Sequence, residues 1–326
     1  MILKLINEPI LFQGRKKHRK YFEGWYFKQV SSDLKKSINI ISGITKDTCD
    51  THAFIQTIIS ISDDSNKRLE SHYHKFSIDD FKYNDDSFSL QICKNTFNCD
   101  GIRLELIDSA YSLSGEINFS QFTKIKTNPI CPNIMGYYSY LPFMECYHGI
   151  ISMNHYLEGS LLLNEEEIDF SYGKGYIEKD WGISFPKEYI WLQSNNFKQS
   201  DASLMCSIAN IPFIGNSFQG FICNLSICNE EYRFASYNHS KLLKLSYTEN
   251  VINITLSKSN LKLELSAKMY DSEKLKAPKN GSMSNTIKEG LNGVVDVKLV
   301  KKSGEILFKD VGNPCAIEIV KNLQNT

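Results

Sequence analysis

The sequence predicts an all-β protein built from two antiparallel β-barrels or sandwiches packed side by side. Three observations support this fold class: apolar and polar residues alternate along many short segments, turn residues separate those segments, and no apolar stripe with helical spacing extends beyond a turn or two. The chain has 326 residues, which is too long for one small sandwich. With 42% hydrophobic residues and only 8 prolines, it can bury a substantial core.

The predicted strands follow in order along the chain. Regular alternation with a period of two, which places one face on a core and the other in water, occurs at 102–106, 252–256, 261–265, 295–299 and 316–319. Similar but more apolar segments are 38–44, 54–61, 88–92, 161–163, 189–192 and 221–227. Turns are predicted at 84–86, 173–175 and 302–304, and a short helical stretch is predicted around 284–291.

The composition changes along the chain and indicates two domains. Residues 240–326 show mostly regular alternation with lysines on the polar face, whereas residues 129–197 are dense in aromatic residues, glycines and isolated carboxylates. The second pattern suits a strand-built cavity, because side chains that face an internal pocket are large and partly polar. We place the boundary near residue 165, with an N-terminal β-domain over 1–165 and a C-terminal β-domain over 166–326.

Charge and cysteine content exclude some classes of protein. The 37 basic residues balance 37 acidic ones, which argues against a dedicated nucleic-acid-binding protein. The nine cysteines are odd in number and form no CxxC pair, as expected for free thiols in a reducing compartment.

No segment is typical of an export signal or a membrane-spanning helix, so we expect a cytoplasmic protein with at most peripheral membrane contact. The basic run 15–20 is either an anion or lipid-headgroup patch or, as we favour here, a solvated surface.

The first candidate site is the aromatic segment 21–28. As a strand, it places Glu23 and Trp25 on one face and Tyr26 on the other. A carboxylate flanked by aromatic rings is costly to bury unpaired, so Glu23 needs a cation, a hydrogen-bond donor or a proton. An ion pair with a lysine or arginine at a domain interface is an equally good interpretation.

The second candidate site lies in the segment 132–155. His148 could act as an acid or base, oriented by Glu145 or Glu23. A core histidine bonded to a backbone carbonyl is an equally good interpretation. Cys146 lies two positions from His148 but has no evident third partner, so a Cys/His hydrolase is only weakly indicated.

The third candidate site is the segment 173–195. Alternation places Tyr176, Glu178 and Asp180 on one strand face, with the two carboxyls roughly 7 Å apart. Close carboxyls raise the pKa of one of them, and an apolar wall of Trp181 and Trp191 would raise it further. A carboxylic acid that stays protonated near neutral pH is suited to protonating an alkene, and aromatic faces could stabilise the resulting cation. The alternative is an ion-pair network between these carboxylates and nearby lysines.

Several segments together resemble the bacterial branch of the tocopherol cyclase-like family. They are 21–28, 52–56, 134–138, 142–149, 175–182, 184–186, 191–195, 277–278 and 281–283. More distantly, the acidic-Trp-Gly segment at 178–182 is similar to that of carotenoid hydratases, whose fold pairs two lipocalin-like β-domains. The resemblance implies two lipocalin-like domains here and chemistry that begins by protonating an isoprenoid double bond.

These arguments lead to the hypothesis of a cofactor-free enzyme of the isomerase or intramolecular lyase class. It would cyclise a prenylated phenol or hydroquinone to a chroman, with Asp180 or Glu178 as the acid and His148 or Glu23 as the acceptor of the phenolic proton. The residues expected to bind this hydrophobic small molecule are Trp25, Tyr26, Tyr138, Glu145, Tyr176, Trp181, Trp191, Gln193 and Asn195. No metal, other cofactor or nucleic-acid partner is expected.

Alternative functions remain open at this point. Attack by water instead of the phenol oxygen would make the protein a hydratase, and an isoprenoid isomerase would use the same first step. A lipocalin-like carrier would bind an isoprenoid or another lipid without turnover, because barrels readily enclose such ligands.

Overall fold

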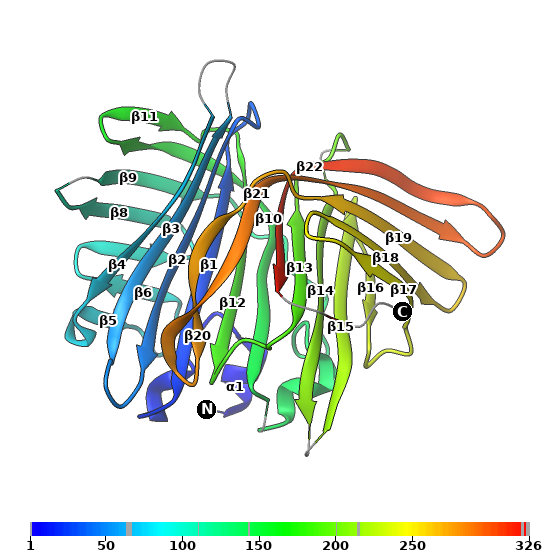
Figure 1. Ribbon diagram of the computed structural model, residues 1–326, viewed down its shortest axis with the longest axis horizontal. Helices are drawn as coiled ribbons and strands as arrows, with labels where there is room; N and C mark the ends of the chain where they lie inside the picture. Colours follow the sequence, from blue (N-terminus) through cyan, green and yellow to red (C-terminus); the bar gives the residue numbers. More distant parts are fainter. Residues whose placement is uncertain are drawn as a thin grey trace. The chain divides into compact units, whose positions relative to one another are not determined.

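The computed structural model is almost entirely β-structure (Figure 1) and describes residues 2–62, 67–109, 111–142, 144–199, 201–213, 216–320 and 323. The chain divides into two compact units. The first comprises Met1–Met135, Glu145–Phe185 and Leu275–Thr286, and the second comprises Gly136–Met144, Pro186–Lys274 and Ile287–Thr326. The predicted boundary at residues 165–166 falls in the turn between strands β10 and β11 of the first unit. The all-β fold class is confirmed.

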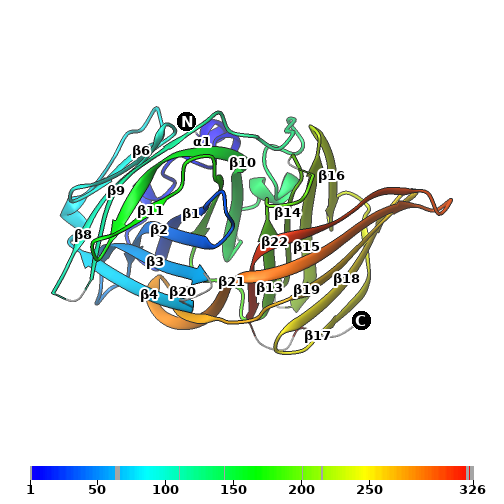
Figure 2. The ribbon, with the colours of Figure 1, turned by 90° about the horizontal axis from the view of Figure 1, so that it is seen from above.

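The first unit is built on one antiparallel sheet, which has 12 strands among the described residues. Their order is β4-β3-β2-β1-β12-β10-β9-β8-β7-β6-β5, and β11 pairs with β10. The bounds are β1 (Tyr21–Val30), β2 (Lys36–Lys46), β3 (His52–Ser62), β4 (Lys67–Phe76), β5 (Phe81–Tyr83), β6 (Ser89–Ile92), β7 (Asn95–Asn98), β8 (Gly101–Ile107), β9 (Ser112–Phe119), β10 (Cys146–Leu163), β11 (Glu166–Asp169) and β12 (Lys174–Gly182). The sheet curls on itself (Figure 2), and residues of β3 contact residues of β6. Short helical segments are α1 (Ile2–Asn7), η1 (Gly14–Lys16) and η2 (Ile78–Asp80).

The other sheet has ten described strands in the order β16-β15-β14-β13-β22-β21-β19-β18-β17, with β20 paired to β21. Most of this sheet forms the second unit, whereas β20 from Leu275 onward and the start of β21 belong to the first unit. The bounds are β13 (Tyr189–Ser194), β14 (Ser203–Phe213), β15 (Asn216–Ile227), β16 (Glu230–Ala235), β17 (Lys241–Tyr247), β18 (Val251–Lys258), β19 (Leu261–Lys268), β20 (Glu273–Lys279), β21 (Ser282–Lys301) and β22 (Ile306–Val320). The turn η3 (Gly136–Tyr140) also belongs to the second unit. No helix among the described residues of the chain is long and apolar enough to cross a membrane.

The alternation of apolar and polar residues predicted the positions of the strands well. Two other predictions, the helix at 284–291 and the turn at 173–175, were wrong. The segment 284–291 is not helical but lies in β21, where long-range pairing with β22 places Glu289 opposite Glu318 and overrides local propensity. The predicted turn at 173–175 lies earlier in the chain, at Ser171 and Tyr172, where the N–H of Gly173 donates to the carbonyl of Phe170 over 2.9 Å, and β12 already begins at Lys174. Gly175 serves close packing rather than turning, since a Cβ there would lie 2.2 Å from the His155 Nε2 atom.

Strand β12 lies between β1 and β10, and both of its faces are largely buried. Ile177 and Trp181 point into the apolar core of the first unit, which also contains Trp25 and Phe27. Because side chains alternate along a strand, the residues at even positions of β12 point to the opposite face. Each face therefore has its own chemistry.

A fully buried ion pair lies on the core face of β12. The Nζ atom of Lys179 is 2.5 Å from Oε1 of Glu23 and sits between the rings of Trp25 and Trp181, at 4.5 and 4.9 Å from their centroids. Lys179 also donates to two carbonyls of residues 9–11, and Glu23 accepts two backbone N–H groups of residues 13–14. Burial lowers the pKa of Lys179 to about 8, although the Glu23 carboxylate opposes this shift. The pair therefore attaches the N-terminal segment to the sheet.

Replacing Lys179 with Met should lower the free energy of unfolding by roughly 3–5 kcal/mol, because it leaves the Glu23 carboxylate buried without its cation. Urea unfolding monitored by tryptophan fluorescence measures this loss. The double variant Glu23→Gln/Lys179→Met should recover a large part of it, because no unpaired charge remains. A single-variant loss below about 1 kcal/mol would contradict this role of the ion pair.

Candidate active site

The even positions of β12 bring several predicted site residues to one face of the sheet. Asp180 is directly opposite His148 on β10, and Glu178 is directly opposite Tyr26 on β1. Directly opposed residues of antiparallel strands point to the same side, so these four side chains share a face with Tyr176. The register of three adjacent strands therefore assembles this group.

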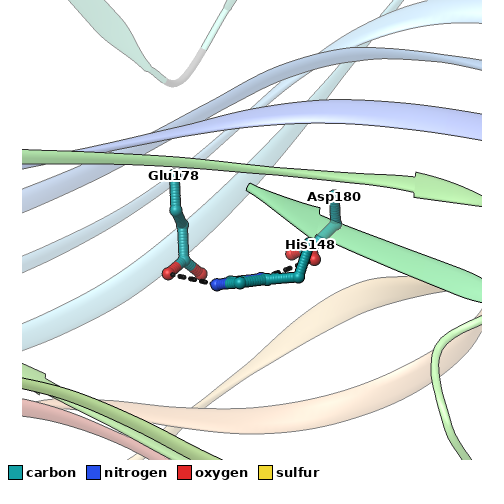
Figure 3. A group of neighbouring side chains, drawn as sticks. All are labelled: His148, Glu178 and Asp180. Atoms are coloured by element: carbon teal, nitrogen blue, oxygen red, sulfur yellow. Dashed lines mark hydrogen bonds and ion pairs between the residues drawn. The ribbon is translucent and has the colours of Figure 1, made fainter. Parts of the chain in front are cut away.

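His148 lies between the two carboxylates (Figure 3). Its Nδ1 atom is 2.8 Å from Oδ1 of Asp180, and its Nε2 atom is 3.5 Å from Oε2 of Glu178. The hydroxyl of Tyr176 donates to the same Glu178 oxygen over 2.5 Å. The exposed fractions of the side chains are 14% for His148, 6% for Glu178 and 21% for Asp180. Asp180 is thus the more accessible of the two carboxyls.

The charges around His148 determine where a proton resides. Burial of the ring lowers its pKa, but the charges of Glu178 and Asp180 and the hydrogen bond to Asp180 outweigh burial and raise the pKa to about 9. At neutral pH the ring is therefore an imidazolium with a carboxylate beside each nitrogen. Burial and the neighbouring Glu178 raise the pKa of Tyr176 well above its ordinary value, so this hydroxyl stays protonated.

The same three residues are the candidates for holding a metal ion. Among the described residues, His148, Glu178 and Asp180 form a group whose ligand atoms all lie within 4.8 Å of one another. A metal ion would have to displace the ring proton, because histidine ligates through a neutral nitrogen. The Nδ1 atom is already engaged with Asp180, which leaves Nε2 and the carboxylate oxygens as donor atoms.

Three predicted site residues lie on the other face of the sheet. Glu23 pairs with Lys179, and the rings of Trp25 and Trp181 flank that lysine in the apolar core. Trp181 also stacks on Tyr147 at 5.5 Å. Neither Glu23 nor either tryptophan therefore lies beside His148. The cause is simple alternation, since residues one position apart on a strand face opposite ways. Glu23 forms an ion pair with a lysine, as the alternative interpretation predicted, but within the first unit and not at a domain interface.

The other predicted residues are distributed over both units. Glu145 lies directly before β10, and its carbonyl accepts the N–H of Ile183 over 2.8 Å. Tyr138 belongs to η3 in the second unit. The remaining three, also in the second unit, are the β13 residues Trp191 and Gln193 and, directly after β13, Asn195. All three are buried, and Trp191 and Gln193 alternate with the core residues Ile190 and Leu192. Phe143 of the resembling segment 142–149 lies outside the described residues.

Two partnerships were not predicted from the sequence. His148 was expected to pair with Glu145 or Glu23, but its partners are Asp180 and Glu178. The second is that of Asn39, whose side-chain amide donates to the hydroxyl of Tyr26 on the same face as the cluster. A signal for Asn39 exists in the sequence, because it is the one amide in the apolar segment 38–44.

The fold and the site together define a class of protein: an all-β protein of two lipocalin-like units that carries a buried acid–base cluster. Residues 119–320 match the tocopherol cyclase-like family, which is more than half of the chain. The chain belongs to this family, and the resemblance found in the sequence is confirmed.

Solved structures show the same fold. CghA in complex with Sch210972 matches with a TM-score of 0.58 at 9% identity, over 92% of this chain and 88% of that chain. Kievitone hydratase from Nectria haematococca matches with a TM-score of 0.52 at 10% identity, over 95% and 93% of the two chains. No curated protein matches the sequence. At these identities the structural likeness concerns the fold alone, whereas family membership supports an isoprenoid-related enzyme.

Raising the pH should weaken the folded state through His148. Its pKa when folded, about 9, exceeds the ordinary value of about 6.5, so its stabilising contribution is fully present below pH 6.5 and is lost as the pH rises through 9. The full contribution is roughly 3 kcal/mol. Urea unfolding at a series of pH values measures the free energy of unfolding of the wild type and of His148→Gln. The difference between the two proteins gives the contribution of His148, because Lys179, whose lowered pKa makes stability rise with pH, is present in both. Equal pH dependence in both proteins would show that His148 is not the titrating group.

Proposed function

We propose that this protein is an acid–base enzyme that protonates an isoprenoid double bond and cyclises a prenylated phenol or hydroquinone to a chroman. The observation that carries the proposal is the buried His148 imidazolium between two carboxylates of different exposure. Membership of the tocopherol cyclase-like family supports the reaction class. The reaction needs one proton donor and one proton acceptor, and this cluster contains both.

Asp180 is the proposed proton donor to the alkene. An imidazolium with a pKa of about 9 is a weak acid, but its proton can pass along the 2.8 Å hydrogen bond to Asp180. Carboxylic acids are intrinsically stronger acids than imidazolium ions, so the transferred proton reaches the alkene from a stronger donor. Glu178 is less exposed and already accepts the Tyr176 hydroxyl, so it is suited to orienting the ring and holding its charge.

The proposed reaction balances without a redox step. The proton from Asp180 forms a new C–H bond as the π bond breaks, and a tertiary cation results. The phenol oxygen then forms the C–O bond, and the phenolic proton returns to the pair of Asp180 and His148. The product is an isomer of the substrate, and the cluster regains its original protonation state. Tyr26, on the same face of the sheet, is the proposed aromatic neighbour of the cation.

Addition of water to the same cation is the second candidate reaction. Its specific support is the likeness in fold to kievitone hydratase. The two reactions share Asp180 as the acid and differ in the nucleophile, so the mass of the product distinguishes them. A carrier, in contrast, needs apolar walls but no proton donor.

Turnover in D2O with a panel of prenylated hydroquinones tests the proposal. Wild-type protein should give a product with one deuterium on carbon and otherwise the mass of the substrate, whereas hydration adds the mass of one water. Asp180→Asn should lower kcat by about 100-fold or more, because a general acid contributes on the order of 10²–10⁴. Liquid chromatography with mass spectrometry measures both effects.

Two controls separate the interpretations of this experiment. Asp79→Asn, an isosteric change at an exposed position of η2, should leave turnover unchanged. Asp180→Asn should retain ligand binding and a cooperative unfolding transition. Tight binding without any deuterium incorporation in wild type would favour the carrier, and loss of the folded state in Asp180→Asn would indicate a structural ion pair.

The rate should also depend on pH through His148. Protonated His148 supplies the proton, so kcat should fall as the pH rises through about 9. A pH–rate profile of wild type against His148→Gln measures this. A wild-type profile that stays flat from pH 7 to 10 would exclude His148 as the proton source.

A further inference from the structure

Six consecutive basic residues, Arg15–Lys20, span the end of η1 and the loop that leads into β1, and all six are exposed. We call this segment the basic loop. Arg15 pairs with Asp85 at 3.0 Å. Within the described part of the chain, Lys16, Lys17, Arg19 and Lys20 have no acidic side chain within ion-pair distance. Since the whole protein has a formal net charge of zero, this loop is a local concentration of unpaired positive charge.

The basic loop is held in place at several points. The Nζ atom of Lys46 donates to the carbonyl of Gly14 over 3.0 Å and to that of Lys17 over 2.8 Å. At its other end, the backbone of Lys20 packs so closely on Gly281 that a Cβ on this glycine would lie 2.3 Å from the Lys20 Cα atom. The loop is therefore ordered before it meets a partner, which lowers the entropic cost of binding.

An exposed apolar side chain lies beside the basic loop. Ile183, directly after β12, is 42% exposed, and its carbonyl accepts the N–H of the same Gly281 over 2.7 Å. Lys279, two residues before Gly281, is exposed as well. Basic residues next to an exposed isoleucine fit an anionic lipid surface, because the charges attract headgroups while the apolar side chain enters the interface.

We infer that the Arg15–Lys20 loop, with Lys279 and Ile183, docks the first unit on an anionic membrane surface. A membrane fits better than a nucleic acid, because an exposed isoleucine gains free energy in a lipid interface and gains none on a phosphate backbone. The inference is independent of the proposed reaction, although a substrate dissolved in the bilayer would be encountered at such a surface.

Vesicle co-sedimentation tests the docking surface. Wild-type protein should bind vesicles of phosphatidylcholine with phosphatidylglycerol, bind phosphatidylcholine vesicles far more weakly, and be released by salt. The variant K16Q/K17Q/R19Q/K20Q should bind the anionic vesicles about 600-fold more weakly, because each of the four basic residues near such a surface contributes roughly fivefold. Ile183→Ser should lose about fivefold through the apolar contribution.

The matched control is K241Q/K244Q/K288Q/K309Q, which removes four exposed positive charges from the second unit. It should retain wild-type binding, and thermal unfolding should show that all variants are folded. Three results would overturn the inference: equal binding to neutral vesicles, an equal loss in the control variant, or tighter binding to a DNA duplex than to anionic vesicles.

Discussion

The rest of the first unit depends on the buried ion pair between Lys179 and Glu23, because this pair sets the register of β12 against β1. A slip of one residue would turn every side chain of β12 to the other face. Glu178 and Asp180 would then enter the apolar core, and Lys179 would lose its partner. Unpaired buried charges cost several kcal/mol, so the slipped strand is strongly disfavoured. A structural ion pair on one face thereby determines which face carries the acid–base cluster.

On the opposite face of β12, the positive charge of His148 stabilises the largely buried cluster of His148, Glu178 and Asp180. Two carboxylates at short distance would repel each other, and the imidazolium of His148 between them relieves that repulsion. The resulting group has one cation for two anions, and its proton can move between nitrogen and oxygen without changing the total charge. The stability of the site and its proposed capacity for proton transfer therefore have the same origin.

Much of the fold could be predicted from local pattern, because antiparallel strands with one buried face alternate visibly in sequence. The strands containing 102–106 and 252–256 are examples. The failures at 173–175 and 284–291 share a cause. In both segments a strand is stabilised by partners distant in sequence, Val30 and Gln29 for the start of β12 and β22 for β21, and local propensity does not report such pairing.

The sequence by itself determined that Glu178 and Asp180 share a strand face with Tyr176, because a period of two is a local property of any strand. It also determined that Glu23 needed a partner, because the cost of burying an unpaired carboxylate does not depend on the fold. Only the tertiary structure decided that this partner is Lys179 and that His148 joins the two carboxylates. Those contacts follow from which strands are neighbours and in which register they pair, and both are set by the packing of the whole sheet.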